Sequence, residues 1–145
     1  MPSKTTVQRA KRDLREGKRP STAAGEFVHE EIEHVRRGKH GARSTKQAIA
    51  IGLSKARRAG VPLRPPKRGQ VKAKTRSSAE RAYEVGQGKR KPRAPSARRS
   101  RATHQALERE GQGVASKRAL STQAKRAAAA RRHRTTRRAT RATAH

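Results

Sequence analysis

The chain has 145 residues, including 40 Lys or Arg and 10 Asp or Glu, which give a formal net charge of +30. Leu, Ile, Val and Phe together supply only 16 residues, a share below the roughly 20% at which a high net charge indicates disorder. Most of the remaining apolar residues are Ala, which bury little area, so the composition argues against one compact globular domain. One Phe, one Tyr and no Trp are available to line a ligand pocket, and we expect neither enzymatic activity nor a cofactor.

Cysteine is absent, which excludes disulfides and Cys-based zinc sites. The N-terminal residues 1–21 are basic but lack the apolar run of roughly 7 to 15 residues that a signal peptide needs. No stretch approaches the ~18 apolar residues of a membrane span, so we expect a cytoplasmic protein without membrane insertion. A charge of +30 attracts polyanions, of which nucleic acid is the most abundant in a cell.

Apolar residues at helical spacing predict a marginal helix in a basic N-terminal segment, residues 1–20. A helical hairpin is expected next, over residues 21–61. Its first helix, capped by Ser21 or Thr22, carries an apolar stripe of Phe27 or Val28, Ile32 and Val35.

Ser44, followed three residues later by Gln47, forms a capping box and predicts the start of the second hairpin helix, over residues 45–59. Small residues on this helix allow close packing against the first. Four acids lie on the first helix and none on the second, so opposite charges favour their pairing within one chain or in a homodimer.

The rest of the chain is predicted to be mostly extended or disordered. Prolines predict a linker over residues 62–76, and Ser77 with Glu80 predicts a short helix over residues 77–86. Residues 87–145 are expected to form a largely disordered basic tail, whose Ala-rich stretches become helical when their charge is neutralised. The predicted fold class is therefore all-α: a small hairpin of two to three short helices with long, disordered, Ala-, Lys- and Arg-rich extensions.

The segment HEEIEH, residues 29–34, resembles the zincin motif in composition. Its two histidines are one residue too far apart to share a helix face and chelate one ion in that way. We therefore expect a solvated helix face and no metal. The alternative is a site in which His40 joins Glu30 and His34.

The loop before the predicted 45–59 helix places three cations around glycines, next to a helix N-terminus that favours anions. It does not match the Walker pattern, so duplex phosphate is the expected occupant, and a solvated turn is the alternative. The tail lacks aromatic residues for base stacking, and Arg outnumbers Lys by 27 to 13, which favours backbone contact over sequence readout. The predicted phosphate-binding residues are Lys39, Arg43, Lys46, Lys55, Arg57, Arg58, Lys117, Arg118, Lys125, Arg126, Arg131, Arg132, Arg137 and Arg138.

The sequence GEFVHEEIEHVRRGKHGARSTKQAIAIGLSKARRAG, residues 25–60, resembles the core of a family of small, basic, uncharacterised bacterial proteins with a domain of unknown function. Residues 44–57 carry the most specific part of the resemblance. The resemblance implies a bacterial source and brings no activity or catalytic residues. The tail is similar in composition to the tails of linker histones and histone-like nucleoid proteins.

These observations favour a non-enzymatic, histone-like protein of the nucleoid that binds DNA without sequence specificity by neutralising phosphates. An RNA-binding or ribosome-associated basic protein is the first alternative. A cationic protein that binds anionic membrane surfaces or acidic protein partners is the second.

Overall fold

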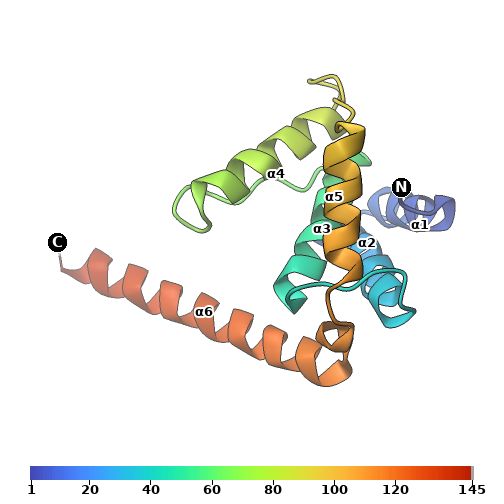
Figure 1. The fold of residues 1–145 in the computed structure, drawn as a ribbon. Helices are drawn as coiled ribbons and strands as arrows, with labels where there is room; N and C mark the ends of the chain where they lie inside the picture. The colour runs from blue at the N-terminus through green and yellow to red at the C-terminus, as the bar shows by residue number, and fades with distance from the viewer. Residues whose placement is uncertain (145) are drawn as a thin grey trace.

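A computed structural model describes residues 1–144. This part of the chain folds into six α-helices and one short 3₁₀ turn (Figure 1). In chain order these are α1 (Lys4–Arg15), α2 (Pro20–Arg36), α3 (Thr45–Arg58), α4 (Ala73–Gly86), α5 (Ala97–Glu108), the 3₁₀ turn η1 (Gly113–Ala115) and α6 (Lys117–Thr143).

The prediction of a small hairpin with long disordered extensions is wrong, because ordered helices continue through most of residues 73–143. The reason lies in what fills the core. Nine of the thirteen buried apolar residues in the described chain are Ala. Small side chains let helices approach closely, so counting only large apolar residues underestimates how much of this chain can pack.

One core cluster joins the first three helices. Ala10 of α1 packs with Ala24 and Phe27 of α2 and with Ala56 of α3. Phe27 is 1% exposed and is the largest buried apolar side chain. Gly52 allows the close approach of α3 to α2, since a Cβ atom at this position would lie 2.7 Å from the Cα atom of Val28.

A second cluster joins α2 and α3 to the C-terminal part of the chain. Ile32 and Val35 of α2 pack with Ala42, with Ala48 of α3 and with Ala115 of η1. Ala115 is fully buried. Residues assigned from the sequence to a disordered tail therefore complete the core, and the apolar stripe of α2 is covered within one chain.

Of the helix starts of α2 and α3, one differs from the prediction and the other agrees with it. Ser21 and Thr22, the predicted caps of the second helix, lie inside α2, which begins at Pro20 and has no side-chain cap. The third helix begins at the expected Ser44, whose hydroxyl accepts a hydrogen bond from the N–H of Gln47 at 3.1 Å. The side chain of Gln47 accepts from the N–H of Arg43 at 2.6 Å, so the capping box is displaced by one residue.

The fourth helix starts earlier than the capping-box prediction placed it. It begins at Ala73, and Ser77 lies inside it with its hydroxyl accepting a weak hydrogen bond from Arg81 at 3.3 Å. Ala79 and Ala82 are its buried residues.

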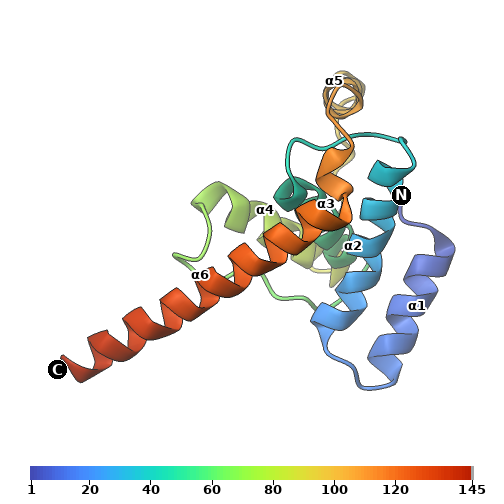
Figure 2. The same ribbon diagram turned by 90° about the horizontal axis from the view of Figure 1, so that it is seen from below.

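The last two helices contribute little to the core, and Leu120 at the start of α6 is the residue of α6 that packs against the second cluster. Neither α5 nor α6 has a buried residue, and α6 extends away from the other helices (Figures 1 and 2). Its order agrees with its local sequence, because Ser116 caps its N-terminus and Ala and Arg favour helix. None of the described helices is both long and apolar enough to cross a membrane.

Candidate nucleic-acid interface

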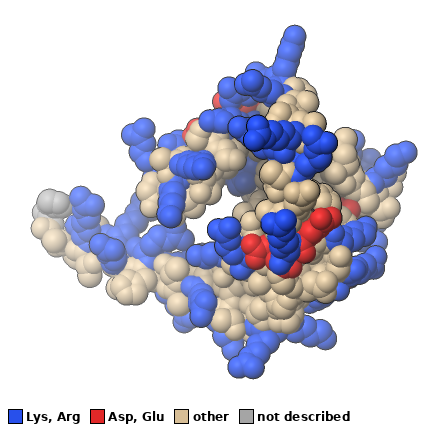
Figure 3. All heavy atoms as spheres, in the orientation of Figure 1, with Lys and Arg blue, Asp and Glu red and all other residues tan. Residues whose placement is uncertain are grey.

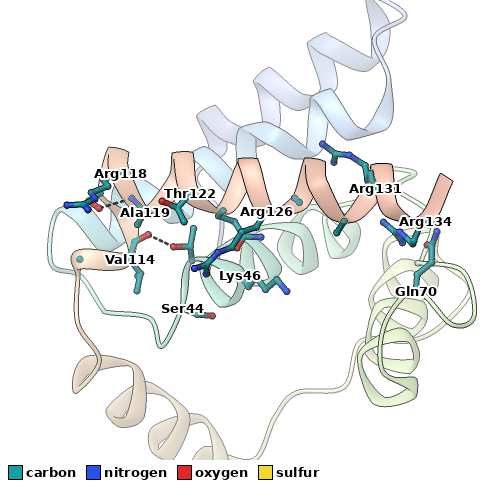
Figure 4. Close-up of a pocket in the computed structure, with 16 residues that line it drawn as sticks. Ser44, Lys46, Gln70, Val114, Arg118, Ala119, Thr122, Arg126, Arg131 and Arg134 are labelled. Atoms are coloured by element: carbon teal, nitrogen blue, oxygen red, sulfur yellow. Dashed lines mark hydrogen bonds between the residues drawn. The ribbon is translucent and has the colours of Figure 1, made fainter. Parts of the chain in front are cut away.

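An open groove of about 990 Å³ runs between α6 and the N-terminal turn of α3 (Figure 4). Ser44 and Arg118 lie toward one end of it, and Gln70 and Arg134 lie at the other.

Two helix N-termini meet at one end of the groove. The hydroxyl of Thr45, in the first turn of α3, donates a hydrogen bond to the carbonyl of Val114 at 2.7 Å and so ties α3 to the turn that precedes α6. Ser44 and Ser116 cap the two helices, each accepting from the backbone N–H three residues on at 3.1 Å. The other first-turn N–H groups have no intrahelical partner, so both helix dipoles favour an anion here.

The walls of the groove carry positive charge only. Its 16 lining residues include one Lys, four Arg and no acid. In the close-up, Lys46 of α3 and Arg126 of α6 approach from opposite walls. The cationic lining residues are Lys46, Arg118, Arg126, Arg131 and Arg134.

Four of the predicted phosphate-binding residues thus share one surface, and Arg134 joins them. Sequence reasoning missed Arg134 because it looked for basic doublets and this arginine stands alone. Its spacing could have identified it, because Arg134 follows Arg131 by three residues and therefore lies on the same side of a helix.

The other predicted residues of α6 lie elsewhere on the helix. At about 100° per residue, Lys117, Lys125 and Arg132 lie opposite Ala130, a groove residue, and they do not line the groove. A shallower hollow near the end of α6 is lined by Arg134, Arg137, Arg138, Thr140 and Arg141.

Two predicted phosphate-binding residues of α3 have partners within the chain. The ammonium of Lys55 lies 2.6 Å from Oε2 of the buried Glu31. Arg57 is 8% exposed, its Nε–H donates to the carbonyl of Leu63 at 3.1 Å, and burial lowers the pKa of its guanidinium. Both side chains support the fold. Arg58 is exposed at the opposite end of α3 from the groove.

The glycine loop that suggested a phosphate cradle uses its backbone donors internally. The N–H of Gly41 donates to the carbonyl of Leu107 at 2.8 Å, and that of Ala42 donates to the carbonyl of Gly111 at 3.2 Å. Lys39 and Arg43 are exposed beside these bonds, and neither lines the groove.

The acids of the chain cannot neutralise this surface. Each of the ten lies within 4.0 Å of a basic side chain, and most of the 40 Lys and Arg therefore remain without an acidic partner. Figure 3 shows the result on one face, where Lys and Arg cover the surface broadly and acids are confined to small patches.

Comparison with known proteins finds a match in the N-terminal part of the chain. A DUF6496 domain, from a family of unknown function, is found over residues 3–68. This domain spans α1, α2 and α3 and includes the whole 25–60 segment that suggested such a family. It contributes the α3 end of the groove, and the α6 wall lies beyond it. No curated protein and no solved structure gives a significant match to the chain.

Proposed function

We propose that this protein binds duplex DNA by neutralising backbone phosphates, with little dependence on base sequence. The observation that supports the proposal best is the groove between α3 and α6, where five cationic side chains and two helix N-termini converge without an acid among the lining residues. Arg can grip phosphate in a bidentate way, and free N–H groups at helix N-termini add further donors.

The dimensions of α6 suit a duplex. Its 27 residues, at about 1.5 Å each, give a length of ~40 Å, slightly more than one helical turn of B-DNA. Cationic residues surround this helix, and the chain offers almost no aromatic residue on which exposed bases could stack. Contacts to phosphate are therefore favoured over readout of bases.

The proposal also has consequences for the location and role of the protein in the cell. A protein that coats duplex DNA in this way in a bacterial cytoplasm would be nucleoid-associated and histone-like in action. The proposal needs no homodimer, because the apolar stripe of α2 is already covered by other parts of the same chain.

The test compares two variants with the same loss of charge. The groove variant replaces Lys46, Arg118, Arg126, Arg131 and Arg134 by Gln. The control variant replaces five exposed cations outside the groove by Gln, and these are Lys117, Lys125, Arg132, Arg98 and Arg101. Affinity for a labelled duplex is measured by fluorescence anisotropy at one fixed salt concentration.

We expect the groove variant to lose affinity on the order of tenfold more than the control, because the groove concentrates the phosphate contacts. Equal losses would mean that binding depends on total charge and would remove the groove from the mechanism. Structured RNA serves as competitor in a second arm. Preference for the RNA would favour the ribosome-associated alternative over DNA.

A further inference from the structure

A polar cluster in the DUF6496 domain brings together three side chains of the types that bind metal ions. It consists of Glu31 and His34 on α2 and His40 in the loop between α2 and α3. One ligand atom from each residue lies within 4.8 Å of the other two. The carboxylate of Glu31 is 1% exposed, and the imidazoles of His34 and His40 are 19% and 15% exposed. The cluster thus lies in the interior, on the side of α2 that faces α3.

The hydrogen bonds of His40 orient its ring as a ligand. Its Nδ1 lies 2.9 Å from the carbonyl of Gly41, which can only accept, so Nδ1 carries the hydrogen. Nε2 of the ring then faces Oε1 of Glu31 at 2.7 Å, and in a ring that carries its one hydrogen on Nδ1 this nitrogen has a free lone pair. Two acceptors at this distance require a cation between them, either a proton or a metal ion. A backbone carbonyl on the remote nitrogen is the usual support of a metal-binding histidine.

The other two groups are also prepared for a cation. His34 adds a second imidazole three residues after Glu31, on the same side of α2. Its Nδ1 lies 3.9 Å from Oε2 of Glu31. Neither ring nitrogen of His34 forms a hydrogen bond with another described residue. Oε1 of Glu31 is buried and lies 2.7 Å from Nε2 of His40.

The charges around the cluster leave room for a divalent ion. Lys55 binds Oε2 of Glu31 at 2.6 Å and leaves Oε1 for a second partner. Glu30 adds a second carboxylate, 3.8 Å from Nε2 of His34. Oε1 of Glu30 also accepts a hydrogen bond from the N–H of Ser3 at 2.9 Å. The ammonium groups of Lys39 and Lys55 and the carboxylates of Glu30 and Glu31 all act on this pocket, and Oε1 of Glu31 is the carboxylate oxygen left for an ion.

From this geometry we propose that Glu31, His34 and His40 bind one divalent transition-metal ion, with Zn²⁺ as the best fit. Two imidazoles and one carboxylate are a ligand set that suits Zn²⁺, and a water would complete a tetrahedral site. The site lies within the family domain and does not depend on the proposed DNA binding.

A bound ion would hold the loop between α2 and α3. Through its backbone, this loop binds Leu107 and Gly111 near the end of α5. Metal binding would therefore stabilise the contact between the DUF6496 domain and the C-terminal part of the chain.

The test titrates Zn²⁺ into the full-length protein, treated beforehand with a chelator and free of nucleic acid, in competition with a chromophoric zinc chelator. The wild-type chain should bind one ion. His40→Gln and His34→Gln should each weaken binding at least about tenfold, since loss of even an outer supporting group costs this much in known sites. Co²⁺ should give the visible absorption bands of a tetrahedral site in the wild-type chain and lose them in His40→Gln.

The matched control is His104→Gln. Nδ1 of His104 lies 3.0 Å from Oε1 of Glu108, so these two residues form a His and Glu pair that lacks a third ligand. The side chain of His104 is 67% exposed. This variant should bind Zn²⁺ like the wild type. Circular dichroism checks that each variant is folded. The melting temperature is a second readout: Zn²⁺ should raise it in the wild type and leave it unchanged in His40→Gln. No tight binding to the wild type, or equal binding by all variants, would overturn the proposal.

Discussion

At the scale of single residues, similar charges in this chain have different roles, and burial separates them. Lys46 and Lys55 are both on α3, but Lys46 lines the groove and Lys55 pairs with a carboxylate that is 1% exposed. The sequence alone shows two lysines on one predicted helix and does not distinguish their roles. Only the position of Glu31, 24 residues earlier in the chain, makes Lys55 part of the fold.

Replacing Lys55 by Met should destabilise the protein. The change leaves the buried carboxylate of Glu31 without its ammonium, and breaking a buried pair costs about 3–5 kcal/mol. Lys55 is partly exposed, so we expect a smaller loss of about 2 kcal/mol in the free energy of unfolding, measured by urea denaturation. Lys46→Met, an exposed substitution on the same helix, is the control and should change stability by less than about 0.5 kcal/mol. Equal stability of the two variants would contradict the structural role of Lys55.

At the scale of helices, two glycines in similar surroundings along the chain should respond in opposite ways to the same change. Gly52 in α3 contacts the backbone of α2, whereas Gly25 in α2 has no atom within 4 Å of the position that a Cβ would take. Both have ordinary helical backbones, so the difference comes from packing alone.

Gly52→Ala should therefore lower the free energy of unfolding by about 1–3 kcal/mol, because the added methyl forces α2 and α3 apart. Gly25→Ala should raise it by about 0.5–1 kcal/mol, because Ala favours helix and meets no obstacle. Thermal or urea unfolding of the two variants checks both signs. A stabilised Gly52→Ala variant would show that the two helices are not in the close contact described.

Local signals account for what the sequence predicts well at this scale. The cap at Ser44 lies within four residues of its partner, and the apolar stripe of α2 follows from spacing along one helix. The second core cluster depends on contacts that no local pattern contains. Arg36, for example, donates through Nε to the carbonyl of Ala115 at 2.8 Å, across 79 residues. The expectation of a disordered tail failed because it overlooked such contacts and the packing capacity of Ala.

The candidate groove also has features that the sequence predicts and features that it does not. Composition and charge runs identify Lys46, Arg118, Arg126 and Arg131 as candidates one by one. Their convergence requires the turn at η1, which brings the start of α6 beside the start of α3. Sequence reasoning therefore predicts the chemistry of the surface but not its shape.

At the scale of the whole molecule, charge is divided unevenly along the chain. Six of the ten acids and 18 of the 40 basic residues lie in residues 3–68, the DUF6496 domain. After Gly111 the chain has ten Lys or Arg and no acid, and all ten are on α6. Both parts are therefore basic, but only the first contains acids that offset some of its charge, and the groove lies where this domain and α6 meet.

Removing residues 117–145 tests this division. The deletion removes ten cations and no acid, and with them four of the five cationic residues of the groove. On duplex DNA, log affinity should fall linearly with log salt at a slope of about −0.9 for each neutralised phosphate. Loss of the four groove arginines alone should make the slope less steep by about 3.6, with affinity at low salt falling in parallel.

The same titrations separate phosphate neutralisation from base readout. Exchanging one duplex sequence for another should change affinity of the intact chain by much less than the ~1–3 kcal/mol per base pair that is typical of direct readout. Circular dichroism of the truncated chain should retain the helices of residues 4–108, because both core clusters consist mainly of residues before position 117. An unchanged salt slope after truncation would place the binding surface within residues 1–116. A strongly preferred sequence that survives high salt would replace phosphate neutralisation with specific recognition.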